Sequence, residues 1–247
     1  DKLQVHMEKG VSALISSYTM EGRKACSLLA DAYGLSVYES GEAKDVTITL
    51  DLMKRTAQAS RLSPWLGRVK KGNPRVGHIY GLGVAGYWGS TIEIETAAFP
   101  ARTQGKGTIR FNDTAGSMAK DSVSTAAAVV RLVTGKDLSD YDLHVNIVGG
   151  GNIDGPSAGA AITCAIVSAV ENRPLRQDLA VTGEISLSGD VKPVGGVMEK
   201  AFGARQAGMK GILIPAENKA DIDAKTIGID VIPVTHIRDV LDTMLVK

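Results

Sequence analysis

Segments with strand and helix patterns alternate along the C-terminal part of the chain, and this order restricts the possible folds more than any other feature. Short β-branched or apolar runs predict strands, and apolar residues three and four positions apart predict helices. A chain in which the two patterns alternate is expected to fold as a layered α/β domain with a partly parallel sheet. The expected elements are strand 143–148, helix 157–170, strands within 180–188, helix 196–206, strand 211–214, strand 231–233 and helix 237–245.

The segment before these elements belongs to the same predicted domain. It shows strand patterns over 76–80, 91–99 and 107–111, followed by a helical pattern over 117–133. Ile92, Ile94 and Thr96 alternate with other residues, as is typical of a half-buried strand. The domain is therefore of mixed α/β (α+β) type.

Residues 1–62 show only helical patterns and predict a small all-helical subdomain. The expected helices are 8–19, 22–34 and 49–60, with Gly34 ending the second and Thr47 or Thr49 capping the third. Residues 63–76 are rich in proline, glycine and basic side chains, which is typical of a linker. The predicted organisation is a helical subdomain over 1–62, a linker over 63–76 and a larger domain over 77–247.

The composition excludes several classes of protein. The chain has 247 residues, of which 44% are hydrophobic and 22% charged, as in a folded globular protein. A net charge of +1 gives no field that would attract nucleic acid or an acidic membrane surface. No apolar run approaches the roughly 18 residues of a transmembrane helix, and no signal peptide precedes the first helix, so we expect a cytoplasmic protein without membrane partners.

Two further expectations come from the cysteines and from the first residue of the chain. Cys26 and Cys164 lie in predicted helices without a CxxC pair or a Cys/His cluster, so we expect reduced, buried thiols and no metal site. The chain begins with Asp1, directly before a predicted helix, and we expect it to be part of a longer polypeptide.

A glycine-rich segment, Gly81 to Gly86, matches the GxGxxG pattern of dinucleotide-binding proteins. That pattern binds a pyrophosphate only when a helix follows, because the N-terminus of the helix holds the phosphates. Residues 87–99 show a strand pattern instead, so the sequence predicts a glycine-rich hairpin. No cofactor is expected at this segment.

A second glycine-flanked segment, Gly155-Pro156-Ser157-Ala158-Gly159, matches the G-x-S-x-G pattern of serine nucleophiles. The predicted helix that follows would direct its unpaired N–H groups and its positive dipole end toward an oxyanion beside Ser157. The alternative is a serine that only caps the helix after a glycine turn. This segment by itself leaves both interpretations open.

A histidine base for Ser157 is not found in the order that the α/β-hydrolase fold requires. His236 is the only histidine after Ser157 and lies near the end of the chain, and His144 lies within a predicted strand, where we expect a core residue. A lysine becomes a base when burial removes its charge. Lys200 has only glycine, valine and alanine neighbours on its helical face, whereas Lys192 lies in a polar turn beside Asp190 and should be solvated. A surface position for Lys200 is the alternative.

Four segments together resemble the catalytic domain of Lon proteases, over residues of about 78–247. They are residues 154–159 around Ser157, 182–189 (Thr-Gly-Glu-Ile-Ser-Leu-Ser-Gly), 191–200 ending at Lys200, and 211–218 (Gly-Ile-Leu-Ile-Pro-Ala-Glu-Asn). The resemblance implies a peptidase domain of the Lon type with Ser157 as nucleophile, Lys200 as general base and Thr182 as the hydroxyl that positions the lysine. Asp154, Gly155 and Pro156 would be supporting residues of the same site.

The helical subdomain resembles the C-terminal part of the AAA+ ATPase module of the same family, with Arg23 in the place of a nucleotide-sensing arginine. The whole is most similar to bacterial B-type Lon. Asp154 lacks the preceding lysine of the common pattern, and Asp121 stands where a glutamate is expected. These departures leave the Ser–Lys pair intact but change the expected shape of the substrate groove.

The resulting expectation is a serine endopeptidase that uses no metal or organic cofactor in this chain and degrades unfolded or damaged proteins as part of a hexameric ring or spiral. ATP and Mg²⁺ are expected only for the full-length parent, because no phosphate-binding loop of the form GxxxxGK[ST] occurs here. Two alternatives remain: a serine esterase or lipase, and a non-enzymatic module that only assembles rings.

Overall fold

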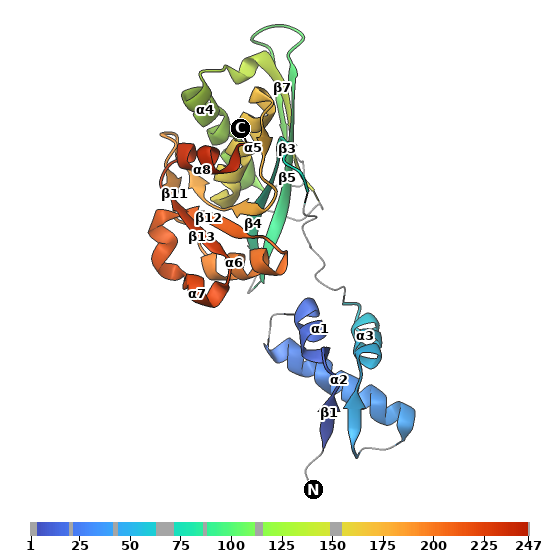
Figure 1. Ribbon diagram of the computed structural model, residues 1–247. Helices are drawn as coiled ribbons and strands as arrows, with labels where there is room; N and C mark the ends of the chain where they lie inside the picture. The colour runs from blue at the N-terminus through green and yellow to red at the C-terminus, as the bar shows by residue number, and fades with distance from the viewer. Residues whose placement is uncertain are drawn as a thin grey trace. The chain divides into compact units, whose positions relative to one another are not determined.

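The computed structural model describes residues 4–19, 22–41, 44–62, 72–85, 88–111, 116–148 and 155–246. The chain divides into two units, Asp1–Leu66 and Gly67–Lys247 (Figure 1). Each unit has its own hydrophobic core. No helix in the described ranges is long and apolar enough to span a membrane.

The first unit is mainly helical but also contains a two-stranded sheet. Its helices are α1 (Val11–Tyr18), α2 (Gly22–Ser40) and α3 (Leu50–Ala59), and β1 (Val5–Met7) pairs in parallel with β2 (Val46–Ile48). The prediction of an all-helical subdomain is therefore wrong in this respect. Strands of three residues are too short for an alternating pattern to stand out from the helices around them.

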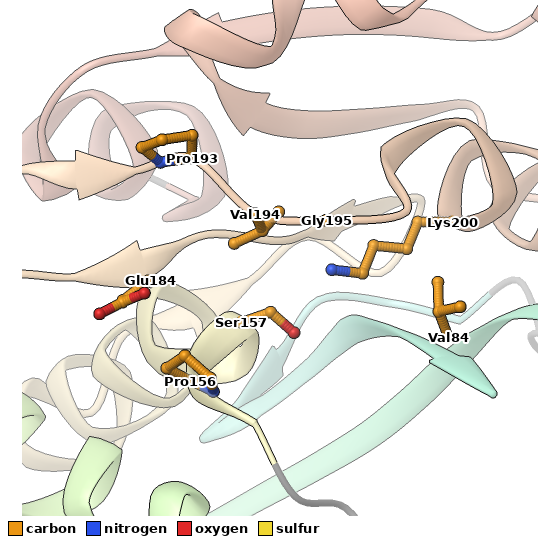
Figure 2. Close-up of a pocket in the computed structure, with 8 residues that line it drawn as sticks. All are labelled: Val84, Pro156, Ser157, Glu184, Pro193, Val194, Gly195 and Lys200. Carbon is orange, nitrogen blue, oxygen red and sulfur yellow. The ribbon is translucent and has the colours of Figure 1, made fainter. Parts of the chain in front are cut away.

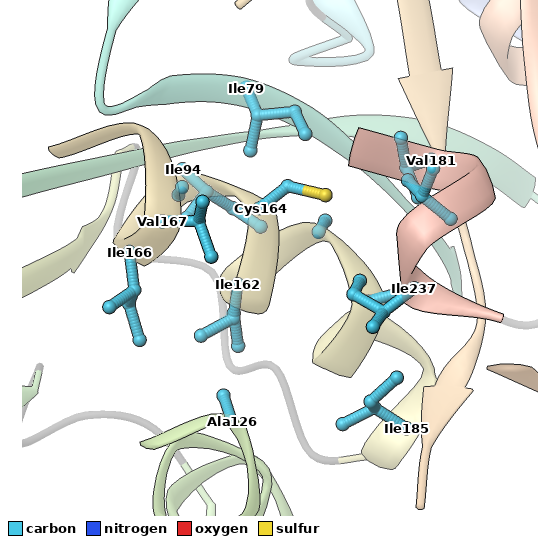
Figure 3. Packing of buried hydrophobic residues seen from close by; sticks show 14 of the residues in the cluster. Ile79, Ile94, Ala126, Ile162, Cys164, Ile166, Val167, Val181, Ile185 and Ile237 are labelled. Carbon is cyan, nitrogen blue, oxygen red and sulfur yellow. The ribbon is translucent and has the colours of Figure 1, made fainter. Parts of the chain in front are cut away.

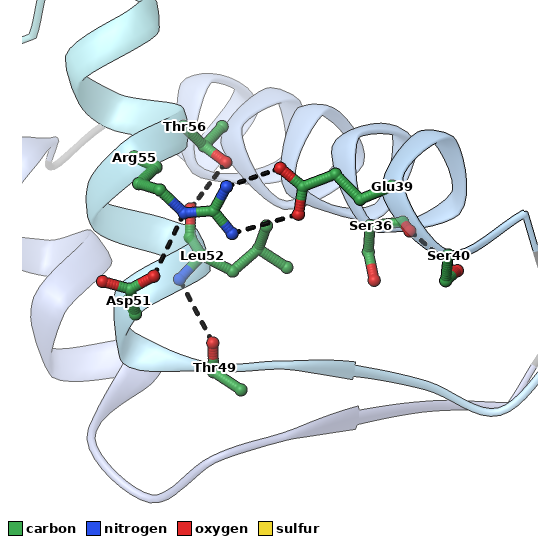
Figure 4. Close-up of polar contacts among 8 residues, drawn as sticks. All are labelled: Ser36, Glu39, Ser40, Thr49, Asp51, Leu52, Arg55 and Thr56. Atoms are coloured by element: carbon green, nitrogen blue, oxygen red, sulfur yellow. Dashed lines mark hydrogen bonds and ion pairs between the residues drawn. The ribbon is translucent and has the colours of Figure 1, made fainter.

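The second helix runs past the glycine that was predicted to end it. A glycine inside a helix costs only about 1 kcal/mol, and Leu35 and Val37 beyond it pack against the core of the unit. Arg55 of α3 contacts both Glu39 of α2 and Asp51, so the last turn is also held by an ion pair (Figure 4). Thr49 caps α3 by accepting a hydrogen bond from the Leu52 N–H, which confirms one of the two predicted caps.

A seven-stranded mixed sheet forms the centre of the second unit, with strand order β13-β12-β9-β4-β5-β7-β6. The pairs β9/β4, β9/β12, β12/β13 and β6/β7 are parallel, whereas β4/β5 and β5/β7 are antiparallel, so the predicted partly parallel sheet is confirmed. The strands are β4 (His78–Ala85), β5 (Trp88–Pro100), β6 (Ile109–Phe111), β7 (Tyr141–Ile147), β9 (Leu179–Val181), β12 (Gly211–Pro215) and β13 (Asp230–Val234).

Two short antiparallel pairs accompany the main sheet. β3 (Arg75–Val76), in a segment that the sequence analysis assigns to the linker, pairs with β8 (Pro174–Leu175). β10 (Glu184–Ile185) pairs with β11 (Val191–Lys192).

Helices cover both faces of the sheet because its central strands are apolar on both sides. In β4, Ile79 packs against the core that contains α5, whereas Tyr80 and Leu82 pack against the core that contains α6 (Figure 3 shows the first core). The helices of the first core are α4 (Ser117–Thr134), α5 (Gly159–Glu171) and α8 (Ile237–Met244). Those of the second core are α6 (Val197–Gln206) and α7 (Ala224–Ile227). The unit also contains 3₁₀ turns at Leu138–Asp140, Pro156–Ala158 and Ala216–Asp221.

The glycine-rich segment forms the predicted hairpin. Gly81 and Gly83 lie within β4, opposite Ile92 and Ser90 of β5, and no helix follows them. The last glycine of the motif, Gly86, lies outside the described residues.

The two cysteines differ in exposure. Cys164 is buried in α5, as expected, and burial raises the pKa of its thiol strongly. Cys26 is exposed, so the prediction of a buried thiol is wrong there. The buried positions of α2 are Leu28 and Ala32, and a residue two positions before Leu28 faces away from that side of a helix.

Candidate active site

Ser157 lies in the middle of a 3₁₀ turn, Pro156–Ala158, and α5 begins only at Gly159. The predicted α-helix from Ser157 therefore starts two residues late, because Pro156 opens a tighter turn before it. The residue that caps α5 is Ala158, and no side-chain cap is present at either helix start. Within the described residues the Ser157 hydroxyl makes no hydrogen bond, so the interpretation as a helix cap is wrong.

Backbone hydrogen bonds fix this turn against the loop that follows β9. The Gly183 N–H donates to the Ser157 carbonyl at 3.0 Å, and the Ala160 N–H donates to the Gly183 carbonyl at 3.0 Å. Gly159 allows the close approach, because a Cβ there would lie 3.0 Å from Cγ2 of Ile185. The position of Ser157 is thus set by main-chain contacts on two sides.

Thr182 is fully buried at the end of β9. Its hydroxyl donates to the Ser157 carbonyl at 3.3 Å, and among the described residues it makes no hydrogen bond to Lys200. In this structure Thr182 therefore contacts the backbone of the serine, whereas the family resemblance implied a contact with the lysine.

Lys200 lies in the first turn of α6 and is only 3% exposed. Burial lowers the pKa of its ammonium to about 8, and the nearby Glu199 carboxylate acts in the opposite direction. The surface alternative for this lysine is therefore wrong, and the expected lowering of its pKa is present. Desolvation has this effect because a charge is far less stable away from water.

Two glycines allow a close contact between β5 and α6, the helix that carries Lys200. A Cβ on Gly203 would lie 2.2 Å from the Gly89 carbonyl oxygen, and a Cβ on Gly89 would lie 1.7 Å from the Glu199 carbonyl oxygen. Backbone thus packs directly on backbone at this crossing, which brings the helix close to the sheet.

We expect Gly203→Ala to destabilise the protein by about 3 kcal/mol, the upper end for overpacking, because neither backbone can yield easily. The shift of α6 should also move Lys200, which this helix carries. A matched control is Gly34→Ala in the exposed face of α2, where a Cβ meets nothing within 4 Å; it should gain up to about 1 kcal/mol. Chemical denaturation of both variants measures the difference, and equal midpoints would contradict the prediction.

Ser157 and Lys200 line one pocket of about 300 Å³, into which both side chains point (Figure 2). Among the described residues no hydrogen bond joins Ser157 Oγ to Lys200 Nζ, the contact that proton transfer between the two groups would need. Catalytic hydrogen bonds are often long in a site without substrate and shorten when it binds. The other residues of the pocket are Val84, Pro156, Glu184, Pro193, Val194 and Gly195.

The remaining predicted site residues lie as follows. Gly155 and Pro156 form the start of the serine turn, and Asp154 lies outside the described residues. Arg23 is exposed near the start of α2 in the first unit. Lys192 is exposed and pairs with Asp190 at 3.5 Å, as expected for a solvated lysine.

No histidine of the described residues lines the pocket. His144 is exposed on β7, so the expectation of a core residue is wrong; neighbouring Leu143 and Val145 are the buried residues of that strand. His236 caps α8 through its side chain. His78 is buried and lies within hydrogen-bond distance of Gln177 and Glu93. Lys200 is therefore the only basic side chain of the described pocket.

Five lining residues were not singled out from the sequence, and they come from three parts of the chain. Val84 follows the glycine-rich part of β4, Glu184 begins β10, and Pro193, Val194 and Gly195 lie in the loop before α6. Only the tertiary fold brings these parts to Ser157. The segments 182–189 and 191–200 contained the available signal, since the first includes Glu184 and the second includes Val194.

Comparison with known proteins gives one family. The model of the Lon protease (S16) C-terminal proteolytic domain matches residues 64–247. Lon protease 2 of Bacillus subtilis is 38% identical over 262 positions, which cover 100% of this chain and 46% of that protein. The archaeal Lon protease of Thermoplasma volcanium is 40% identical over 70% of this chain and 28% of its own length. Lon protease of Erwinia amylovora is 35% identical over 95% of this chain and 29% of its own length.

The second unit is a mixed α/β domain in which a buried lysine and a serine, without a hydrogen bond from its hydroxyl to a described residue, line one pocket. The chain belongs to the Lon protease family, as the matches over most of its length show. It spans less than half the length of the curated relatives reported above.

Proposed function

We propose that this chain is the proteolytic part of an ATP-dependent Lon-type protease and hydrolyses peptide bonds with Ser157 as nucleophile and Lys200 as general base. The observation that supports this most directly is the shared pocket, in which a hydroxyl without a hydrogen bond to any described residue lies with a lysine whose pKa burial lowers to about 8. A lysine with an ordinary pKa near 10.4 would be almost fully charged at neutral pH and unable to accept a proton.

The proposed reaction begins with transfer of the Ser157 hydroxyl proton to neutral Nζ of Lys200. Oγ forms a bond to the substrate carbonyl carbon, and the backbone N–H group of Ser157 stabilises the resulting oxyanion. Lys200 then returns the proton to the amide nitrogen as the C–N bond breaks, and a peptide with a free amine leaves. Water hydrolyses the acyl-enzyme in the same way and restores the serine.

An active-site label tests the assignment against both alternatives. A peptide boronate should bind Ser157 and block cleavage, with loss of labelling in Ser157→Ala. An esterase would hydrolyse small esters but not peptides, and a module that only assembles rings would neither label nor cleave. The basic group of the described pocket is Lys200 and not a histidine, so we favour the peptidase.

The proposal also includes the AAA+ ATPase module of the longer parent enzyme. Arg23 stands as a proposed nucleotide-sensing residue of an AAA+ module whose remaining parts would lie in the longer polypeptide. The hexameric ring, the ATP and Mg²⁺ requirement, the unfolded protein substrates and the cytoplasmic location are proposed for that parent.

We expect this chain by itself to cleave short or unfolded peptides at the same rate with and without ATP. The reason is that the sequence lacks a phosphate-binding loop, while the pocket with Ser157 and Lys200 is present in the second unit. A fluorogenic peptide assay with and without ATP and Mg²⁺ measures this, with a stably folded protein as a second substrate that should stay intact. Stimulation of peptide cleavage by ATP would contradict the prediction.

A further inference from the structure

The pocket around Ser157 contains a second ionisable side chain whose role the peptidase reaction leaves open. Glu184 and Lys200 are the only charged or titratable residues among its lining residues, and the other side chains of the wall are largely apolar. In Figure 2 Glu184 and Lys200 lie on opposite sides of Ser157. When Lys200 is neutral, as the reaction requires, the Glu184 carboxylate is the remaining charge of the described wall.

Glu184 has no ionic partner in the described part of the chain, although a lysine stands directly opposite. In the antiparallel pair β10/β11, Glu184 faces Lys192, and opposite charges at such positions normally attract. The ammonium of Lys192 pairs with Asp190 instead, at 3.5 Å. The Glu184 side chain is exposed and makes no hydrogen bond or ion pair to another described residue. Its charge therefore remains available to a ligand in the pocket.

The backbone that carries Glu184 is fixed relative to the nucleophile. The preceding residue, Gly183, exchanges hydrogen bonds with the Ser157 carbonyl and the Ala160 N–H, both at 3.0 Å. The following residue, Ile185, is buried against Gly159. A side chain on such a support keeps a defined distance from the reacting atoms, which is what a specificity contact needs.

Glu184 makes no hydrogen bond or ion pair with Lys200 among the described residues, although both line the pocket. Burial and Glu199 are the causes that shift the pKa of Lys200, and Glu184 is not among them. A direct acid–base role is thus unsupported, whereas a contact with bound substrate is compatible with every observation.

We propose that Glu184 is a specificity-determining residue, which selects peptides with a lysine or arginine side chain close to the scissile bond. This inference rests on the proposed peptidase function of the same pocket. The carboxylate attracts the basic side chain and repels an acidic one at that position. An exposed pair of this kind favours the basic peptide by about two- to fivefold, and less at high salt because ions screen the charges.

The test uses fluorogenic peptides that are identical except for one position, which holds Lys, Gln or Glu and is moved through the residues flanking the cleaved bond. The wild-type chain should show a higher kcat/KM for Lys than for Glu at one such position. Glu184→Gln should abolish that ratio, and Glu184→Lys should reverse it. Glu217→Gln, an exposed glutamate of the Ala216–Asp221 turn outside the pocket, is the matched control and should keep the wild-type ratio.

A second readout separates specificity from catalysis. Glu184→Gln should keep the midpoint of the pH–activity curve, whereas Glu199→Gln should lower it, because the Glu199 carboxylate raises the pKa of Lys200. An unchanged Lys/Glu ratio in Glu184→Gln, or an equal change in Glu217→Gln, overturns the specificity proposal while cleavage of the Gln peptide still supports the peptidase. Failure of the wild-type chain to cleave any of the peptides overturns the proposed function itself.

Discussion

Ser157→Ala should abolish peptide cleavage and leave the fold unchanged. The substitution removes the proposed nucleophile, and loss of a nucleophile reduces kcat by about a thousandfold or more. Stability should change by less than about 1 kcal/mol, because the hydroxyl neither caps a helix nor makes a hydrogen bond within the described residues. Steady-state cleavage of a fluorogenic peptide and a thermal melt measure the two effects on one sample.

A serine outside the pocket serves as the control for this experiment. Ser124 is exposed on α4, and Ser124→Ala should keep full activity. If Ser157→Ala retains turnover while a boronate still inhibits it, another nucleophile is present and the assignment must be abandoned. If Ser157→Ala loses activity together with its melting transition, the hydroxyl has a structural role that the contacts do not show.

The architecture around the serine was largely predictable because the patterns there are strong. The strands β9 and β12 are short apolar runs, and their alternate residues enter the two cores on opposite faces of the sheet. The spacing of small residues around Lys200 correctly indicated that its helical face was apolar. Local pattern therefore indicated Ser157 and Lys200 as candidates, and the family resemblance supplied their expected roles.

The contacts that complete the site depend on residues far apart in the chain. Gly89 and Gly203 show no pattern of their own, yet their backbones meet and bring α6 onto β5. Thr182 contacts the Ser157 carbonyl because the loop after β9 is bonded to the serine turn, an arrangement that no spacing rule predicts. For the same reason the sequence did not show that Glu184 would share the pocket with Ser157.

The differences between the predicted and the observed elements each have a physical cause. The helix after Ser157 starts late because Pro156 opens a 3₁₀ turn, and α2 is longer than predicted because packing of Leu35 and Val37 exceeds the small cost of one glycine. The strands β1 and β2 stabilise each other only in the folded unit, so their short segments carry little signal. In the last two cases, packing between elements overrides a weak local preference.

Replacement of Lys200 is the second change with a large expected effect. Lys200→Arg should be inactive, because a guanidinium stays protonated at all working pH values and cannot accept the serine proton. Lys192→Arg is the matched control, since Lys192 is exposed and paired with Asp190, and it should be nearly silent. Wild-type activity should rise with a single ionisation near pH 8, the pKa to which burial lowers Lys200. A flat profile between pH 6 and 10 would contradict a lysine base.

Stability should depend on the same ionisation, with a definite sign. The folded pKa of Lys200 is about 8 and the unfolded value 10.5, so below pH 8 the unfolded chain holds the proton more firmly and folding is penalised. At about 1.4 kcal/mol for each pH unit of difference, the penalty is roughly 3 kcal/mol below pH 8, declines between pH 8 and 10.5, and is absent above that. Lys200→Met removes both the proposed base and the penalty. The variant should therefore be inactive yet more stable than the wild type at pH 7. The free energies of unfolding of the two proteins should converge as the pH approaches 10.5. Urea denaturation of both proteins at pH 7 and at pH 10 measures this difference. A Lys200→Met variant that is less stable than the wild type at pH 7 would mean that Lys200 is a solvated or paired ammonium and not the base of the reaction.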